Sequence, residues 1–442
     1  MDTIHALSSG GLPAGVAVVR VSGPACRFVL ETTIETLPEP RRASLRSIRH
    51  RNGDEIDRGL VLWLPGPESF TGEDMIEFQV HGSRAVVSAL ARHLDGYDAV
   101  RPAEAGEFTR RAFLAGRIDL TEAEGLADLL AAETEVQRRQ AAGQAAGSLR
   151  RLYEGWRERL VRIRALIEAD FDFADEEDVP GSVADAAWEE ARRLAVEIRS
   201  HLGEAHRGER LRQGFRVALL GRPNAGKSSL LNALARRDVA IVTEEAGTTR
   251  DPIEVHLDIA GLPVTVVDTA GLREAEGRIE AEGVRRAVEK GREADLVLWA
   301  RGLDDPGGVS DLPDLHGTDV WEVFTKADLG SAPGDRFESA TKSLTLSVVA
   351  GSGLAELVEA LGAAAAERLG SGDRVQPSRE RHRVHLERAV AELDRAAADV
   401  WKDAELRSED LRRAGDELGR LTGAIGVEDL LDVIFREFCI GK

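Results

Sequence analysis

The stretch Gly221-Arg222-Pro223-Asn224-Ala225-Gly226-Lys227-Ser228-Ser229 decides how the centre of this chain is expected to fold. It follows the apolar run 215–220 and precedes the helix-like run 230–235, so a strand should lead into a glycine loop that opens into a helix. Glycines let backbone N–H groups turn towards phosphates, and the lysine and hydroxyl stand at the spacing of a phosphate-binding loop. We predict a nucleotide site with Lys227 on the phosphates and Ser228 on Mg²⁺.

A second motif ends the apolar run 264–268, where Asp268 is followed by Thr269-Ala270-Gly271. An aspartate at this point is expected to hold Mg²⁺ through water, and Gly271 leaves room for a backbone N–H at the γ-phosphate. Between the two motifs, 247–251 supplies hydroxyls at switch-loop distance, and Thr249 is expected to contact Mg²⁺ directly.

A third motif, Thr325-Lys326-Ala327-Asp328, also follows an apolar run. An aspartate here can accept hydrogen bonds from N1–H and the exocyclic amine of guanine, a donor pair that adenine lacks. The three motifs together predict a GTPase rather than an ATPase.

The residue after Gly271 is Leu272, where Ras and Gα carry the glutamine that orients the attacking water. Leucine cannot form that hydrogen bond, so another group must act. One of four glutamates in the next segment could orient the water. An arginine supplied in trans, or a monovalent cation that Asn224 could coordinate, could neutralise the charge of the transition state. The glutamates are Glu274, Glu276, Glu280 and Glu282.

Composition limits the other possibilities. A chain of 442 residues suggests about three domains. It has two cysteines and no apolar run of membrane-spanning length, so we expect a soluble cytoplasmic protein with no disulfide framework. The net charge of −20 argues against broad, non-specific nucleic-acid binding but leaves local arginine clusters possible.

The first part of the chain, to about residue 116, mixes short strand-like runs with turns and predicts an α+β domain. Strands are expected at 15–21, 59–64 and 75–80, and helices at 85–94 and 108–115.

Long helical periodicity begins at Thr121, where Thr121 and Glu124 form a capping-box pattern. One helix is expected to run towards Gly147, with others at 149–170 and 184–206. Similar texture resumes at 379–401 and from 408 onwards. We predict one discontinuous all-α domain whose two parts flank an inserted domain.

The inserted region alternates strand and helix patterns. Its expected strands are 215–220, 255–260, 264–268, 296–300, 320–325 and 344–347. Only Gly261-Leu262-Pro263 separates the second from the third, which indicates an antiparallel hairpin. The rest reads as crossover units, so we predict a Ras-like α/β domain with a mostly parallel sheet.

Taken together, these motifs resemble the tRNA-modifying GTPases of the MnmE (TrmE) family over nearly the whole chain. The stretches 69–74, 106–113 and 119–128 and the tail Phe438-Cys439-Ile440-Gly441-Lys442 look like the same family. The resemblance implies an N-terminal folate-binding and dimerisation domain (1–117), a helical domain (118–212 and 373–442) and a G domain (213–372).

The resemblance also implies a mechanism in which two G domains dimerise with K⁺ bound. The water-orienting glutamate falls on Glu280, and the K⁺ site on Asn224, Thr243, Glu245 and Thr248. The GTP contacts would be Asn224, Ala225, Gly226, Lys227, Ser228, Ser229, Thr243, Thr248, Thr249, Asp268, Gly271, Lys326, Asp328, Ser347 and Val348.

In the N-terminal domain the resemblance implies binding of 5-formyl-tetrahydrofolate or a related tetrahydrofolate by Arg20, Glu77, Arg117 and Lys442. The family works as a homodimer with a flavoprotein of the MnmG (GidA) type, in a heterotetramer. It adds an aminomethyl or carboxymethylaminomethyl group to C5 of the wobble uridine of tRNA. Cys439 is a candidate for chemistry, although a cysteine beside Phe435 and Phe438 is more often a small buried hydrophobe.

Two residues depart from the family pattern. Thr325 stands where asparagine is usual, and Val349 replaces a lysine; both are expected to affect nucleotide affinity more than nucleotide identity. The rival from another class is a regulatory GTPase associated with RNA or the ribosome that modifies nothing.

Overall fold

The computed structural model describes residues 2–172, 183–237, 239–241, 254–268, 289–304, 315, 317–331, 340–370, 372, 374–398, 404–426, 431, 434, 435, 438 and 441. The chain divides into two compact units. One comprises Met1–Ala127, Gln144–Ala191 and Ala391–Lys442, and the other comprises Asp128–Gly143 and Arg192–Val390.

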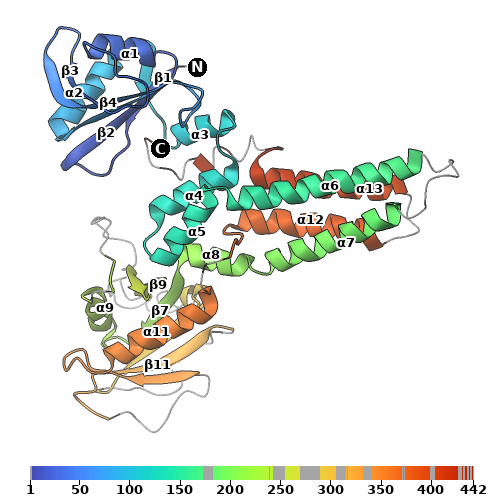
Figure 1. Ribbon diagram of the computed structural model, residues 1–442. Helices are drawn as coiled ribbons and strands as arrows, with labels where there is room; N and C mark the ends of the chain where they lie inside the picture. The colour runs from blue at the N-terminus through green and yellow to red at the C-terminus, as the bar shows by residue number, and fades with distance from the viewer. Residues whose placement is uncertain are drawn as a thin grey trace, which may run out of the picture. The chain divides into compact units, whose positions relative to one another are not determined.

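The N-terminal part of the first unit is a six-stranded sheet in the order β3-β4-β5-β2-β1-β6 (Figure 1). All neighbours are antiparallel except β1 and β6. The strands are β1 (Thr3–Leu7), β2 (Ala14–Ser22), β3 (Ser44–Arg49), β4 (Glu55–Leu64), β5 (Met75–Gly82) and β6 (Val100–Pro102); the helices are α1 (Cys26–Thr33), α2 (Arg84–Asp95) and α3 (Glu107–Leu114). The predicted α+β class is confirmed, and β1, β3, β6 and α1 are additions to it.

Side chains along β2 alternate between the two faces of this sheet, one apolar and one polar. Val19 and Val21 belong to the apolar core that includes residues of α1 and α2. Arg20 and Ser22 therefore point to the opposite face, because successive side chains of a strand alternate.

The expected single helix from Thr121 towards Gly147 is wrong. The structure has α4 (Leu120–Ala131) and α5 (Glu135–Ala145) instead. The Gln137 carboxamide oxygen accepts hydrogen bonds from the N–H groups of Glu133 and Thr134, at 3.1 Å each, and the Thr134 hydroxyl accepts one from the Gln137 N–H. This capping box starts a new helix. The capping box expected of Thr121 and Glu124 is wrong, because α4 begins at Leu120. Asp119 caps it instead: Asp119 Oδ1 accepts the Glu122 N–H at 2.7 Å, and Glu122 Oε2 accepts the Asp119 N–H at 2.8 Å.

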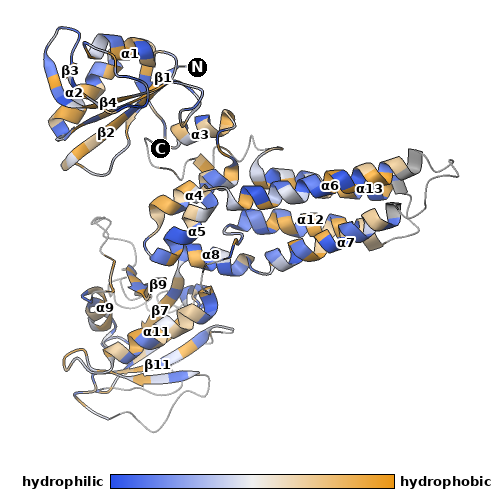
Figure 2. Ribbon diagram, in the orientation of Figure 1, coloured by the Kyte–Doolittle hydropathy of each residue, from blue (hydrophilic) through white to orange (hydrophobic). Residues whose placement is uncertain are grey.

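The other helices of this texture are α6 (Ser148–Asp172), α7 (Val183–Leu202), α8 (Ala205–Gln213), α12 (Glu380–Ala398) and α13 (Ala404–Thr422). The helix expected over 184–206 is thus two helices, α7 and α8, divided at Gly203. In the first unit α6 packs against α13, and both helices mix hydrophobic and hydrophilic residues (Figure 2). The Arg407 guanidinium of α13 lies 3.5 Å from the ring centroid of Trp188. None of the helices that the structure describes is long and apolar enough to cross a membrane.

The second unit holds the predicted mostly parallel sheet, in the order β12-β11-β10-β7-β9-β8. Only β8 is antiparallel, in the expected hairpin with β9. The elements are β7 (Phe215–Gly221), α9 (Lys227–Ala235), β8 (Glu254–Ile259), β9 (Leu262–Asp268), β10 (Leu296–Gly302), β11 (Asp319–Thr325), β12 (Lys342–Thr345) and α11 (Leu354–Leu369). The strand expected at 344–347 lies two residues earlier, because Ser347 pairs with Ser352 in a turn beyond β12.

The segments that lead into and out of the inserted domain both form hydrogen bonds to one carboxylate, that of Asp128. Asp128 accepts hydrogen bonds from Arg212 at 2.9 Å, just before β7, and from Arg379 at 2.8 Å, just before α12. Both ends of the inserted domain are therefore fastened at the same point.

Candidate functional site

The loop between β7 and α9 has the backbone of a phosphate cradle. Asn224 and Gly226 have φ angles of +61° and +81°, and Gly221 has +144°. A Cβ on Gly221 would lie 2.3 Å from the Ala300 carbonyl oxygen, so glycine is required where the loop leaves β7. Left-handed residues interleaved in such a turn aim successive N–H groups inwards, which is the geometry that binds anions.

Lys227 begins α9, and its ammonium group is directed at this loop. Nζ donates hydrogen bonds to the carbonyl oxygens of Gly221 at 2.8 Å and Arg222 at 2.7 Å. Ala225 is buried, whereas Asn224, Ser228 and Ser229 are exposed. The helix N-terminus and the lysine thus supply the positive charge that a phosphate requires.

Asp268 is the last residue of β9, which lies beside β7 and parallel to it. Leu219 pairs with Asp268 in the sheet register, two residues before the loop begins at Gly221. The backbone therefore brings the second motif to the same edge of the sheet as the first.

The third motif is supported by a serine from another loop. The Ser347 hydroxyl donates to the Asp328 carboxylate at 2.5 Å and accepts the Ala350 N–H at 3.0 Å. Lys326 has φ of +58°, and its ammonium group pairs with Asp304 at 2.5 Å. Val348 is half-buried and Val349 is 88% exposed. The Ser347 hydroxyl, itself oriented by the Ala350 N–H, therefore orients the Asp328 carboxylate.

Thr325 connects the third motif to the first. Its hydroxyl donates to the Ala225 carbonyl oxygen at 2.6 Å, and the Thr325 side chain is buried. The φ of +81° favours glycine at position 226, and a Cβ there would also lie 3.2 Å from the Thr325 hydroxyl oxygen. The residue that departs from the family pattern therefore joins two loops of the site.

Several expected site residues lie outside the described residues. They are Thr243, Glu245, Thr248, Thr249, Gly271, Glu280, Cys439 and Lys442. Their roles remain predictions.

In the N-terminal domain the sheet brings Arg20 and Glu77 together. They are direct partners in the register of β2 and β5, and Arg20 Nε donates to Glu77 Oε1 at 2.8 Å. Their side chains are 29% and 17% exposed, so the pair is accessible from one side. Arg117 is exposed elsewhere, beside Gly72, and no described hydrogen bond or ion pair joins it to Arg20 or Glu77.

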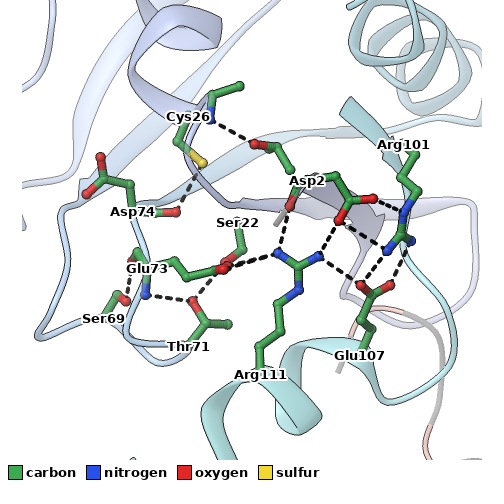
Figure 3. Close-up of polar contacts among 12 residues, drawn as sticks. Asp2, Ser22, Cys26, Ser69, Thr71, Glu73, Asp74, Arg101, Glu107 and Arg111 are labelled. Carbon is green, nitrogen blue, oxygen red and sulfur yellow. Dashed lines mark hydrogen bonds and ion pairs between the residues drawn. The ribbon is translucent and has the colours of Figure 1, made fainter. Parts of the chain in front are cut away.

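A network around Arg111 lies next to this sheet face (Figure 3). Arg111 is 8% exposed and donates to the carboxylates of Glu73, Glu107 and Asp2. Glu73 in turn accepts the Ser22 hydroxyl at 2.8 Å.

Arg101 completes the network by donating to Asp2 and Glu107. Its hydrogen bond lowers the pKa of Asp2. Sequence reasoning missed this cluster. The charged residues within 69–74 and 106–113 are the feature of the sequence that could have indicated it. The network fixes the 69–74 loop against α3, and Gly72 of that loop faces Arg117.

Comparison with known proteins decides the family. The family model described as MnmE helical domain matches residues 120–439, and the one described as GTP-binding protein TrmE N-terminus matches 3–117. The tRNA modification GTPase MnmE of Brucella anthropi is 51% identical over 100% of this chain and 98% of its own length. The chain belongs to the MnmE family of tRNA modification GTPases.

The MnmE of Mesorhizobium japonicum is 52% identical over 100% of this chain and 99% of its own. Among solved structures, the G domain of the T. maritima FeoB iron transporter matches 34% of this chain and 98% of its own, with 27% identity and a TM-score of 0.27. As an MnmE-family protein the chain is a GTP hydrolase of tRNA modification, with an N-terminal α+β domain, a helical domain and a P-loop G domain. The family implies GTP and Mg²⁺ at the phosphate cradle.

Proposed function

We propose that this chain is a K⁺-stimulated GTPase that works with a flavoprotein of the MnmG type to modify C5 of the wobble uridine of tRNA. The group added is aminomethyl or carboxymethylaminomethyl, and its carbon comes from a tetrahydrofolate. The observation that carries the folate part is the Arg20–Glu77 pair, which joins at 2.8 Å two residues that lie 57 positions apart in sequence.

The residues of the G domain suit the phosphates, the Mg²⁺ ion and the base of GTP. Lys227 and the inward N–H groups from Asn224 to Ser229 meet the phosphates, while Ser228 and Thr249 coordinate Mg²⁺ and Asp268 holds it through water. Asp328, fixed by Ser347, reads the guanine N–H donors, and the Val348 N–H meets its O6. Lys326 lines the base, and Gly271 leaves space at the γ-phosphate.

Hydrolysis needs a water-orienting group and a positive charge, and Leu272 provides neither. Glu280 orients the water, and K⁺ held by Asn224, Thr243, Glu245 and Thr248 supplies the charge that an arginine finger gives other GTPases. The Asn224 side chain is exposed on the loop, where a second G domain can close over it. The active form is therefore a homodimer.

The folate site uses complementary charges. Glu77 Oε1 accepts from Arg20 Nε, and in the part of the chain that the structure describes no other side chain bonds Glu77. Its second oxygen can accept the pterin N–H donors, and Arg20, Arg117 and Lys442 are cations for the glutamate tail. When bound, the folate supplies the one-carbon unit.

The test is mass spectrometry of wobble uridines from a strain that lacks this gene. The modification should be lost, restored by the wild-type gene and not restored by Glu77→Gln, which keeps the shape of Glu77 and removes its charge. Purified Glu77→Gln should retain basal GTP hydrolysis, which shows that it folds. Full modification in the deletion strain would refute the proposal and favour a regulatory GTPase.

A further inference from the structure

The carboxylate of Asp304 folds back over the end of β10 to reach Lys326. Asp304 lies two residues beyond Gly302, the last residue of that strand, and its Oδ2 is 2.5 Å from Lys326 Nζ. A Cβ on Gly302 would lie 2.5 Å from Asp304 Oδ1, so the carboxylate occupies the room that a side chain at position 302 would take. Glycine at position 302 therefore permits the ion pair.

The backbone on both sides of this ion pair is held by hydrogen bonds. The Leu303 N–H donates to the Thr325 carbonyl oxygen at 3.0 Å, and Leu303 is buried. Beyond β11, the Leu329 N–H donates to the Lys326 carbonyl oxygen at 2.9 Å. Because the backbone is held in this way, the ion pair chiefly determines where the long lysine side chain lies.

The Lys326 side chain runs from the proposed base-binding loop towards the phosphate loop. Lys326 lies two residues before Asp328 in sequence. Its Nζ would lie 3.7 Å from a Cβ on Gly302, and the Ala225 Cα would lie 3.6 Å from the same point. In the proposed site the base meets one of these loops and the phosphates meet the other, so the methylene groups of the lysine lie along the nucleotide. They offer an apolar surface on which a flat base can lie.

We propose that Asp304 is a positioning residue for the guanine base, which holds the Lys326 side chain against the plane of the ring. The inference rests on the proposed function, because that function places guanine at Lys326 and Asp328. Asp304 acts through the Lys326 ammonium group. The side chains of Asp304 and Lys326 are 41% and 29% exposed, so without the ion pair water would draw the ammonium group away and the methylene groups would leave the base.

Nucleotide affinity of the full chain tests this role. Asp304→Asn removes the charge and keeps the shape, and Lys326→Met keeps an apolar side chain without the ammonium group. Asp304→Asn should weaken GDP binding about threefold to fivefold, the effect expected of a partly exposed ion pair. In the Lys326→Met background the same change should have no effect, because a residue that acts only through Lys326 then has nothing to hold. Glu359→Gln, at an exposed position of α11, is the matched control and should bind GDP like wild type.

A second measurement is the preference for GDP over IDP, whose base lacks the exocyclic amine. Asp328 is proposed to accept a hydrogen bond from that amine, whereas a side chain packed on the plane of the ring contacts both bases alike. Asp304→Asn should therefore weaken binding of the two nucleotides by the same factor and leave the preference unchanged. A substitution that merely disturbed the base-binding loop would reduce the preference.

Unchanged GDP affinity in Asp304→Asn overturns the proposal, as does an equal loss in the wild-type and Lys326→Met backgrounds. A reduced preference for GDP over IDP also overturns it, because Asp304 would then act on the loop that carries Asp328. An equal loss in Glu359→Gln does the same, since it would show a general effect of removing negative charge. These outcomes leave the proposed guanine site standing. Binding of ADP by the wild type as tightly as GDP overturns that site itself.

Discussion

The Thr325 hydroxyl donates a hydrogen bond to the Ala225 carbonyl oxygen at 2.6 Å, across 100 residues of sequence. It joins the end of β11, three residues before the aspartate proposed to bind guanine, to the loop proposed to bind the phosphates. A threonine at this position is expected to affect nucleotide affinity, and its hydroxyl makes a buried link between the two loops.

Thr325→Val should weaken GDP binding about tenfold, because it leaves the Ala225 carbonyl unpaired in a buried place. Thr325→Asn, which restores the usual family residue, should bind GDP within about threefold of wild type if the amide reaches the same carbonyl. Titration with a fluorescent GDP analogue measures both. Thr345→Val, at an exposed position of β12, is the control. Equal affinities for Thr325→Val and wild type would show that the link does not support the site.

GTP turnover should be faster in K⁺ than in Na⁺ at equal ionic strength. Asn224→Gly should remove most of this difference, a loss of about a hundredfold in the K⁺ rate, while GTP binding persists. Glycine is the right replacement, because Asn224 has φ of +61° and glycine adopts that conformation without strain. If wild type hydrolyses GTP equally in both salts, the role assigned to Asn224 is wrong.

Glu280→Ala should lower the rate of GTP hydrolysis by about 10²–10⁴-fold and leave GTP affinity unchanged, since the role proposed for this residue is to orient the attacking water. The neighbouring Glu282→Ala is the matched control and should retain activity. Single-turnover hydrolysis with pre-bound GTP separates the chemical step from binding. A larger loss in Glu282→Ala than in Glu280→Ala would reassign the role.

Asp119 should make stability depend on pH. Burial raises the pKa of Asp119 from 3.8 to about 6. Its Oδ1 accepts the Thr121 hydroxyl and the Glu122 N–H, and its Oδ2 is buried with no hydrogen-bond partner among the described residues. Because the folded-state pKa lies above the unfolded value, the stability due to this group is fully present below about pH 4 and is lost as the pH rises through about 6.

Asp119→Asn removes the charge that is unfavourable above that pH. Relative to wild type, its free energy of unfolding should rise by about 1 kcal/mol between pH 5 and pH 7.5. Urea denaturation at the two pH values measures this change, and Asp98→Asn, at an exposed position, should show none. A difference between Asp119→Asn and wild type that stays constant with pH would contradict the assignment.

Local sequence patterns predict much of the fold. The P-loop context around Lys227, the β8–β9 hairpin and the parallel order of the central sheet all follow from periodicity and short turns. The sequence pattern does not predict the break before α5. The capping box Thr134-Glu135-Val136-Gln137 lies inside a run of helical periodicity, and that periodicity favours one continuous helix.

Contacts between distant residues could not be read from local pattern. The network of Arg111, with Glu73 and Asp2, depends on three segments meeting, and no spacing rule connects them. The pairing of Arg20 with Glu77 has the same origin, since it follows from the register of β2 and β5. The family resemblance selected both of those residues, and the sheet explains how they can act on one ligand.

The fastening of Arg212 and Arg379 to Asp128 has a consequence for protein engineering. Two side chains can reach one carboxylate only if the positions at which the chain leaves and rejoins the helices are close neighbours. A few-residue linker should therefore span the gap if the whole G domain is excised. The same junction should accept a different folded domain whose own termini are adjacent. The helical domain could then be used as a scaffold for inserting other domains.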